Sequence, residues 1–290
     1  MGFLDDLYRK SPLVRRTSRW ARQVPRTLQL MRARPDEYLR SPPIVANSVP
    51  KSGTHLLTQI VGALVEWDYG TFWTSVPSRP YRELPRGTMM RALSRTVPGE
   101  LVSAHLHFDP DFHDALDRQN AVHVFIYRDP RDIVVSEAHY LTNVNNWHGL
   151  HRTFRALGSV GERISLAITG TGPGHRQTYP DVGSRFRRYL GWLQEAGVLA
   201  VRFEDLVGER RTETVQEIVR FYAKRSGRLA EEHVLLARAL AAIDPKRSFT
   251  FREGRSGGWR DVLSDAHKDQ LKATAGALLI ELGYESDLLW

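Results

Sequence analysis

Apolar and polar positions along the chain follow two different periods, and the change between them predicts strands followed by helices. Residues 44 to 48, directly after two prolines, form a short apolar run that is typical of a buried strand. Apolar positions then recur at spacings of three and four, which predicts a helix that begins near Thr54: Leu56, Leu57, Ile60, Val61, Leu64 and Val65. Residues 49 to 53 therefore connect a strand to a helix.

The same alternation continues to the end of the sequence. Further strands are predicted at residues 101 to 106, at residues 121 to 128 and within residues 198 to 206, with helices between and after them. Asp129 is placed to cap the helix after the third strand, with Pro130 at its first position. The order predicts an α/β fold, a central, mostly parallel sheet flanked by helices on both faces, whose ligands bind at the carboxyl ends of the strands.

Charge divides the 290 residues into two parts. Residues 1 to 40 hold ten Lys and Arg against four Asp and Glu, a net of +6 out of +8 for the whole chain. We therefore divide the chain into a basic N-terminal helical segment, residues 1 to 40, and a main domain, residues 41 to 290. The near-neutral domain does not have the footprint of a nucleic-acid-binding surface. The basic segment either packs on its own domain or makes peripheral contact with an anionic membrane.

Two absences narrow the class of protein further. The chain has no cysteine, which excludes a disulfide scaffold and a thiolate metal site. It has neither a long apolar stretch nor a secretory signal, so we expect a cytoplasmic protein. We also find no His, Asp and Glu cluster with metal-ligand spacing, and we expect no metal.

The stretch "PKSGTH" has the chemistry of an anion-binding loop. At a strand-to-helix junction, free backbone amides and the helix dipole favour an anion. Lys51 adds a positive charge, Ser52 and Thr54 add hydroxyl donors, and Gly53 lets the backbone approach closely. The lysine precedes the glycine, so this is not the loop of a P-loop nucleotide hydrolase. Taken alone, the stretch is equally compatible with a surface turn.

Two further segments carry candidate anion-binding residues. In "YRDPRDIVVS", Arg128 ends a strand and Ser136 lies two turns into the next helix. In "FREGRSGGW", Arg252 and Arg255 lie beside three glycines. Taken singly, Arg128 is better explained by a structural ion pair to Asp129 or Asp132, and the second segment is also compatible with a surface loop.

Together and in this order, the three segments resemble the sulfotransferase superfamily, enzymes that use 3′-phosphoadenosine 5′-phosphosulfate (PAPS). The resemblance runs from Ile44 to the C-terminus and also includes "VRFEDL", which is similar to the family's Tyr-Glu-Asp-Leu segment. It implies the P-loop nucleotide-kinase-like sulfotransferase fold. The stretch "PKSGTHLL", with Leu56 where cytosolic members often have an adenine-stacking Trp, is most similar to soluble bacterial members.

The resemblance implies a role for each matching residue. Lys51 contacts the 5′-phosphosulfate and stabilises charge on the bridging oxygen as the bond breaks. The other implied contacts are with the 5′-phosphate (Ser52, Gly53, Thr54 and His55), the 3′-phosphate (Arg128, Ser136, Arg252, Glu253 and Gly254) and, by ring stacking, the adenine (Phe203).

The implied reaction is in-line transfer of a sulfuryl group to a hydroxyl or amine of a small molecule, glycan or lipid, with a histidine as general base. In "LVSAHLHFDP", alignment to the family's Lys-Thr-His-Leu-Pro segment favours His105, but strand alternation does not separate it from His107. An imidazole suits a base at neutral pH. Residues 66 to 100 and 143 to 182 are expected to shape the acceptor pocket.

Two other functions remain as alternatives. A P-loop nucleoside or sugar kinase would share the strand–loop–helix context, but it requires magnesium. A basic module that binds nucleic acid or membrane through residues 1 to 40 would explain the charge and none of the three motifs.

Overall fold

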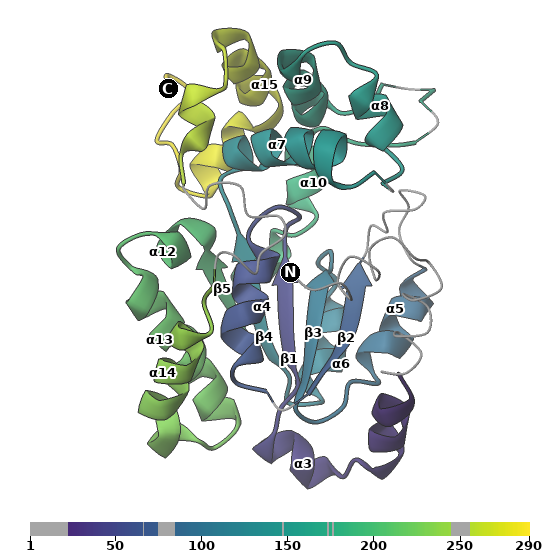
Figure 1. The fold of residues 1–290 in the computed structure, drawn as a ribbon, viewed down its shortest axis with the longest axis vertical. Coiled ribbons are helices and arrows are strands. Elements are labelled where there is room, and N and C mark those ends of the chain that lie inside the picture. The colour runs from purple at the N-terminus through teal and green to yellow at the C-terminus, as the bar shows by residue number, and fades with distance from the viewer. Residues whose placement is uncertain are drawn as a thin grey trace.

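The centre of the computed structural model is a five-stranded sheet, and the model describes residues 23–65, 67–74, 85–146, 148–172, 174–175, 177–244 and 256–290. The strands are β1 (Ile44–Ser48), β2 (Trp67–Thr74), β3 (Glu100–His105), β4 (Val122–Tyr127) and β5 (Val198–Arg202), in the order β2-β3-β1-β4-β5. Every pair of neighbours is parallel. Ser48 lies opposite Ile126 and Tyr127 opposite Arg202, so the strands end at one common edge (Figure 1).

Helices cover both faces because successive residues of each strand point to opposite sides. Ile44 and Ala46 of β1 belong to one core and Val45 to the other. The first core is closed by α4 (Thr54–Gly62), α12 (Phe203–Val207), α13 (Arg211–Arg225) and α14 (Glu232–Ala241). The second is closed by α5 (Arg86–Leu93), α6 (Pro110–Asp117), α10 (Val182–Arg187) and α11 (Gly191–Gln194). The predicted α/β architecture is confirmed.

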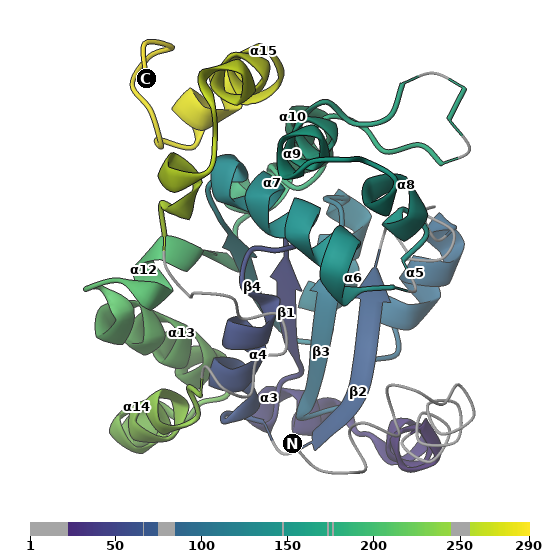
Figure 2. The same ribbon diagram turned by 45° about the horizontal axis from the view of Figure 1, so that its top comes forward.

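A further layer of helices lies beyond the carboxyl edge of the sheet (Figures 1 and 2). It contains α7 (Pro130–His139), a π-helix (Tyr140–Val144), α8 (His151–Arg155), α9 (Val160–Thr169) and α15 (Asp265–Glu281). The Asp129 side chain accepts a hydrogen bond from the Arg131 amide and Pro130 starts α7, as predicted. This layer places α7 above the ends of the strands.

The fold departs from the predicted elements in two places. The edge strand β2 was not predicted, because "WDYGTFWT" contains a glycine and its pairing with β3 shifts register between Trp67 and Thr71. The fourth predicted strand stops at Arg202, where the chain turns directly into α12. Short helices also occur at α3 (Pro35–Arg40), Leu229–Glu231 and Gly258–Asp261.

The described part of the basic N-terminal segment packs on the domain. Residues 23 to 32 are helical, and Arg26 Nε lies 2.6 Å from the buried carboxylate of Glu100. Gln29 and Tyr38 donate hydrogen bonds to the carbonyls of Pro98 and Thr96. These contacts lie at the amino end of β3, and Figure 1 shows α3 at the far end of the sheet from α7.

Among the residues that the structure describes, no helix combines the length and the hydropathy needed to cross a bilayer. The cytoplasmic location, the boundary at residue 40 and the membrane contact stay predictions.

Candidate active site

The loop after β1 begins with a strained turn. The Ser52 amide donates to the Val49 carbonyl at 3.1 Å, which closes a four-residue turn with Pro50 second and Lys51 third. Lys51 has φ of 69°, the left-handed value that glycine normally supplies at the third position of a type II turn. A lysine held there costs roughly 1 kcal/mol, and such strain gathers at functional sites.

The N-terminus of α4 presents uncommitted donors just beyond this turn. The N-cap Gly53, with φ of 98°, provides no side-chain cap. The Leu57 amide makes the first helical bond, to the Gly53 carbonyl, so the amides of residues 54 to 56 have no partner within the helix. The buried Ser52 hydroxyl has no hydrogen-bond partner in the part of the chain described. An anion is the ligand that this arrangement fits.

Phe203 joins this loop to the end of β4. A Cβ atom on Gly53 would lie 2.5 Å from the Phe203 ring, so only glycine allows this close approach. The Arg128 guanidinium lies 4.4 Å from the centroid of the same ring. The aromatic ring is buried between the two. Its contacts therefore include the loop and Arg128 as well as the core, and its stacking on adenine stays a prediction.

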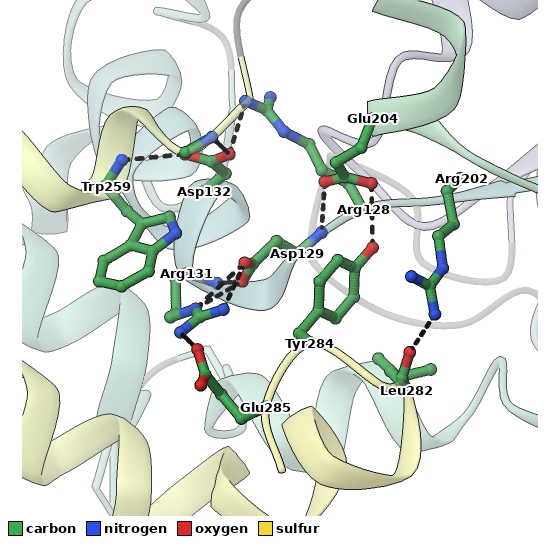
Figure 3. A network of polar contacts seen from close by, with 11 residues as sticks. Arg128, Asp129, Arg131, Asp132, Arg202, Glu204, Trp259, Leu282, Tyr284 and Glu285 are labelled. Atoms are coloured by element: carbon green, nitrogen blue, oxygen red, sulfur yellow. Dashed lines mark hydrogen bonds and ion pairs between the residues drawn. The ribbon is translucent and has the colours of Figure 1, made fainter. Parts of the chain in front are cut away.

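Asp132 ties α7 to the C-terminal glycine-rich segment (Figure 3). Its carboxylate accepts the amides of Gly257 at 2.8 Å and Trp259 at 3.0 Å, and it lies 3.3 Å from an Arg128 nitrogen. Arg128 thus makes one of the two structural pairs considered from the sequence. Ser136 follows Asp132 by four residues, so both lie on one face of α7. Arg128 and Ser136 are brought to one side of this helix.

Arg252, Glu253 and Gly254 lie outside the described residues, but the chain on either side of them is anchored. The Gln59 side chain of α4 exchanges two hydrogen bonds of 3.0 Å with the backbone of Asp244. On the other side, Gly257 is held by Asp132. One anchor belongs to α4, which follows residues 49 to 53, here called the phosphate loop, and the other to α7, which carries Ser136.

A second polar network lies beside α7, and its side chains are bonded to other members of the network (Figure 3). Arg131 pairs with Asp129 at 2.8 Å and with Glu285. Glu204 accepts the Asp129 amide and the Tyr284 hydroxyl, each at 3.0 Å. Burial raises the pKa of Asp129, which Arg131 opposes, and burial also raises the pKa of Glu204. These residues are bonded to one another and fix the start of α7.

His105 ends β3 and is bonded to Ser48, the last residue of β1 before the loop. Its Nδ1 lies 2.8 Å from the Ser48 carbonyl and 3.0 Å from the Ser48 hydroxyl, which is 2.7 Å from Thr54 Oγ1. A carbonyl only accepts, so Nδ1 carries the proton and Nε2 carries the lone pair. The pKa of His105 is lowered to about 4, mainly by burial and also by the charges of Lys51 and His55, while the hydrogen bond to the Ser48 carbonyl acts to raise it. The imidazole is therefore neutral at physiological pH.

His107 has different neighbours, because β3 ends at His105 and strand alternation does not continue. Its ring packs edge-on against Tyr189, with centroids 4.8 Å apart. It lines a pocket between the loop, α7 and α10, together with Val49, Pro50, Ile133, Glu137, Pro180, Val182, Arg185, Phe186, Arg188 and Tyr189. Of the two segments expected to shape an acceptor pocket, residues 143 to 182 contribute Pro180 and Val182 to this lining.

Comparison with known proteins decides the family. The family model for the sulfotransferase domain matches residues 41–283. The chain belongs to the sulfotransferase family. A mouse sulfotransferase solved in complex with PAP has a TM-score of 0.54 and 16% identity over 80% of this chain and 84% of that chain. Retinol dehydratase in a complex with retinol and PAP has a TM-score of 0.52 and 17% identity over 84% and 83%.

None of the curated protein sequences compared with the chain matches it. The two solved structures support the sulfotransferase fold that the motifs implied. A bacterial origin stays a prediction.

Lys51 of this sulfotransferase has an unusual electrostatic setting. Burial lowers the pKa of its ammonium to about 8, the Glu137 carboxylate acts to raise it, and Arg128 acts to lower it. The same ammonium lowers the pKa of His55, in addition to the burial of that imidazole. Lys51 therefore lies close enough to His55 and His105 for its charge to lower the pKa of both imidazoles.

Sequence reasoning missed two residues of the site, Glu137 and Tyr140. Both follow Ser136 on the helix that carries it, and the Tyr140 ring centroid lies 3.9 Å from Lys51 Nζ. Their position within about one helical turn of Ser136 could have identified them from the sequence. No group of three or more His, Asp and Glu in the described ranges is arranged to hold a metal ion.

Proposed function

We propose that this sulfotransferase moves the sulfuryl group of PAPS to a hydroxyl or amine of an acceptor molecule. The observation that carries the proposal is the buried, unpartnered Ser52 hydroxyl beside the uncapped N-terminus of α4, in the described part of a chain of this family. The two PAP-bound relatives support PAPS as the donor, since PAP is what remains of PAPS after sulfuryl transfer.

The residues at the loop bind the 5′ end of the donor. Lys51 faces the group that is transferred, while Ser52, Gly53, Thr54 and His55 donate to the 5′-phosphate. PAPS supplies an activated sulfuryl group when bound. Lys51 neutralises the negative charge that develops on the bridging oxygen, which is electrostatic catalysis of the kind that phosphoryl transfer uses.

The 3′-phosphate is bound on the other side of Phe203. Arg128 contacts it from the end of β4 and Ser136 from α7, and Arg252 with the Glu253 and Gly254 backbone contacts it from the C-terminal segment. The Asp132 bonds to Gly257 and Trp259 support this arrangement, because they hold the end of that segment against α7.

His105 accepts the proton of the acceptor. Its Nδ1 proton is committed to Ser48, and its depressed pKa keeps Nε2 unprotonated and ready to accept. Residues of the pocket along α7 and α10 bind an acceptor that belongs to the small-molecule, glycan or lipid classes. Transfer then requires positioning and charge stabilisation from this chain and no metal.

Isothermal titration with PAP in a metal-free buffer containing EDTA tests the donor. We expect tight binding that is lost in Lys51→Ala or Arg128→Ala. Magnesium-dependent binding of ATP, with no binding of PAP, would establish the kinase alternative and overturn the proposal.

A matched pair of variants tests the base. Radiolabelled PAPS is used to screen phenol, sterol, sugar and lipid acceptors, and the best acceptor is then used with His105→Ala and His107→Ala. We expect His105→Ala to reduce turnover by a factor of about 10² to 10⁴ with PAP affinity unchanged. His107→Ala removes a residue of the pocket wall, so it should change mainly the KM for the acceptor and keep most of its kcat. The reverse result would transfer the role to His107.

A further inference from the structure

The helix that carries Ser136 changes its winding beside Lys51. At His139 the α-helix α7 passes into a π-helix over Tyr140–Val144. The Asn145 amide donates to the Tyr140 carbonyl, five residues back, at 3.0 Å. A π turn is less favourable than an α turn and is frequently found at functional sites. Its first residue here is Tyr140.

The Tyr140 ring lies under the Lys51 ammonium. Lys51 Nζ is 3.9 Å from the ring centroid, well within the range of a cation–π contact. The ring is held by its hydroxyl, which accepts a hydrogen bond from the Asn145 side chain at 2.9 Å. Tyr140 at the start of the π turn and Asn145 directly after it are therefore bonded to each other, and this bond holds the Tyr140 ring against the Lys51 ammonium.

The charges around Lys51 show why such a contact matters. Arg128 acts against the charged ammonium, and Glu137, three residues before Tyr140, acts for it. His55 and His105 also face Lys51 and are neutral near pH 7. With burial opposing the charge as well, an aromatic face adds a favourable interaction that requires no second carboxylate in a site for an anion.

We propose that Tyr140 is a positioning residue that seats the Lys51 ammonium on its ring and keeps it charged beside the phosphate loop. The backbone conformation of Lys51 fixes the direction in which its side chain leaves the loop, and the Tyr140 ring fixes the position of its ammonium group. The role in turnover rests on the proposed sulfuryl transfer, whereas the effect on the charge of Lys51 does not.

Tyr140→Leu and Tyr140→Phe separate the ring from the hydroxyl. Tyr140→Phe keeps the aromatic face, and its turnover should stay within about twofold of wild type. Tyr140→Leu should lower kcat about tenfold and move the basic limb of the pH–rate profile to lower pH, because Lys51 then loses its proton more easily. Tyr38→Leu removes a ring at the far end of the sheet and should change neither. Equal damage in the Phe and Leu variants would place the effect in the Asn145 bond and overturn the proposal.

A measurement that needs no turnover separates this proposal from the function. Lysines are reductively ¹³C-methylated, the Lys51 signal is assigned by its loss in Lys51→Arg, and its titration is followed by NMR. We expect Tyr140→Leu to lower the Lys51 pKa by about one unit, and Tyr140→Phe to leave it unchanged. If Tyr140→Leu does not fold, Tyr140→Met serves as the second non-aromatic variant. An unchanged titration overturns the proposal, while a changed titration without PAP binding overturns only the proposed function.

Discussion

Two groups of polar residues lie side by side at the carboxyl edge of the sheet, and they differ in how their polar atoms are bonded. Around Arg131, the guanidinium is bonded to Asp129 and Glu285 and lies 4.1 Å from the Trp259 ring. In the phosphate loop, the buried Ser52 hydroxyl and the first amides of α4 have no partner in the described chain. The bonded network around Arg131 stabilises the fold, whereas the unbonded donors of the phosphate loop are available to a ligand.

The two groups meet at Arg128 and Asp129, which are neighbours in the sequence. Asp129 is bonded into the Arg131 network, and Arg128 lies over Phe203 next to Gly53. The comparison therefore predicts that substitutions on one side reduce stability, whereas substitutions on the other side reduce binding and turnover.

The largest expected effect on stability is that of Arg131→Met. Arg131 is 2% exposed, and its removal leaves the Asp129 carboxylate buried beside no counter-charge. We expect a loss of about 3–5 kcal/mol in the free energy of unfolding at pH 7.5, measured by urea denaturation. The loss should shrink as pH falls, because protonation removes the charge of an isolated Asp129.

A double variant isolates the charge. Asp129→Asn keeps an oxygen that can cap α7 but carries no charge, so Arg131→Met with Asp129→Asn should recover much of the lost stability. A loss below about 1 kcal/mol in the single variant would show that the network does not hold the fold.

The parts of the fold that were predicted correctly are those encoded in short stretches of sequence. Residues 44 to 48 match β1 as predicted, and the Asp129 cap and Pro130 start α7. The junction between β1 and α4 at residues 49 to 53 was also predicted, and its anion-binding role stays a prediction that rests on its contiguous donors, glycine and lysine. Local periodicity and local capping act within a few residues, so they can be recognised without the tertiary structure.

The parts that were missed depend on tertiary contacts. β2 contains a glycine at a register shift and is a strand because it pairs with β3. His105 and His107 could not be separated, because their difference comes from Ser48 on one side and Tyr189 on the other. Tyr140 was not singled out, because its contact with Lys51 depends on where the π turn places its ring.

His123→Phe tests whether unbonded polar atoms away from the phosphate loop only lower stability, and its expected effect on stability is intermediate. His123 is buried in β4, its two ring nitrogens have no partner among the described residues, and its ring packs against Trp192 at 4.6 Å. It lies in the core rather than at the loop. We expect Phe to increase stability by about 1 kcal/mol at pH 7.5 and to leave PAP affinity unchanged, since an unsatisfied polar group is replaced by an apolar ring.

The gain from this substitution should grow in acid. Burial lowers the pKa of His123 to about 3, below the ordinary value near 6.5 of the unfolded chain. Between these values the unfolded state binds a proton that the folded state does not, so stability falls as pH decreases below 6.5. At pH 5 the Phe variant should therefore gain about 2 kcal/mol more than at pH 7.5. An advantage that is independent of pH would contradict the assignment.

The smallest expected effect on stability is the difference between Lys51→Gly and Lys51→Ala. Both variants remove the ammonium and should lose PAPS-dependent turnover to the same extent. Glycine adopts the φ of 69° without strain, whereas alanine does not, so the Gly variant should be the more stable by about 1 kcal/mol. Urea denaturation of the two proteins measures the difference directly.

Asn120 provides the matched control, because in the described chain it is the other non-glycine residue with positive φ, at 53°. Its side chain donates to the carbonyls of Tyr38 and Arg225 at 3.0 and 3.1 Å, so this residue is bonded where it stands. Asn120→Gly should lower stability, while Lys51→Gly should not. Equal losses at both positions would mean that the fold, and not the anion site, requires a lysine in the strained turn.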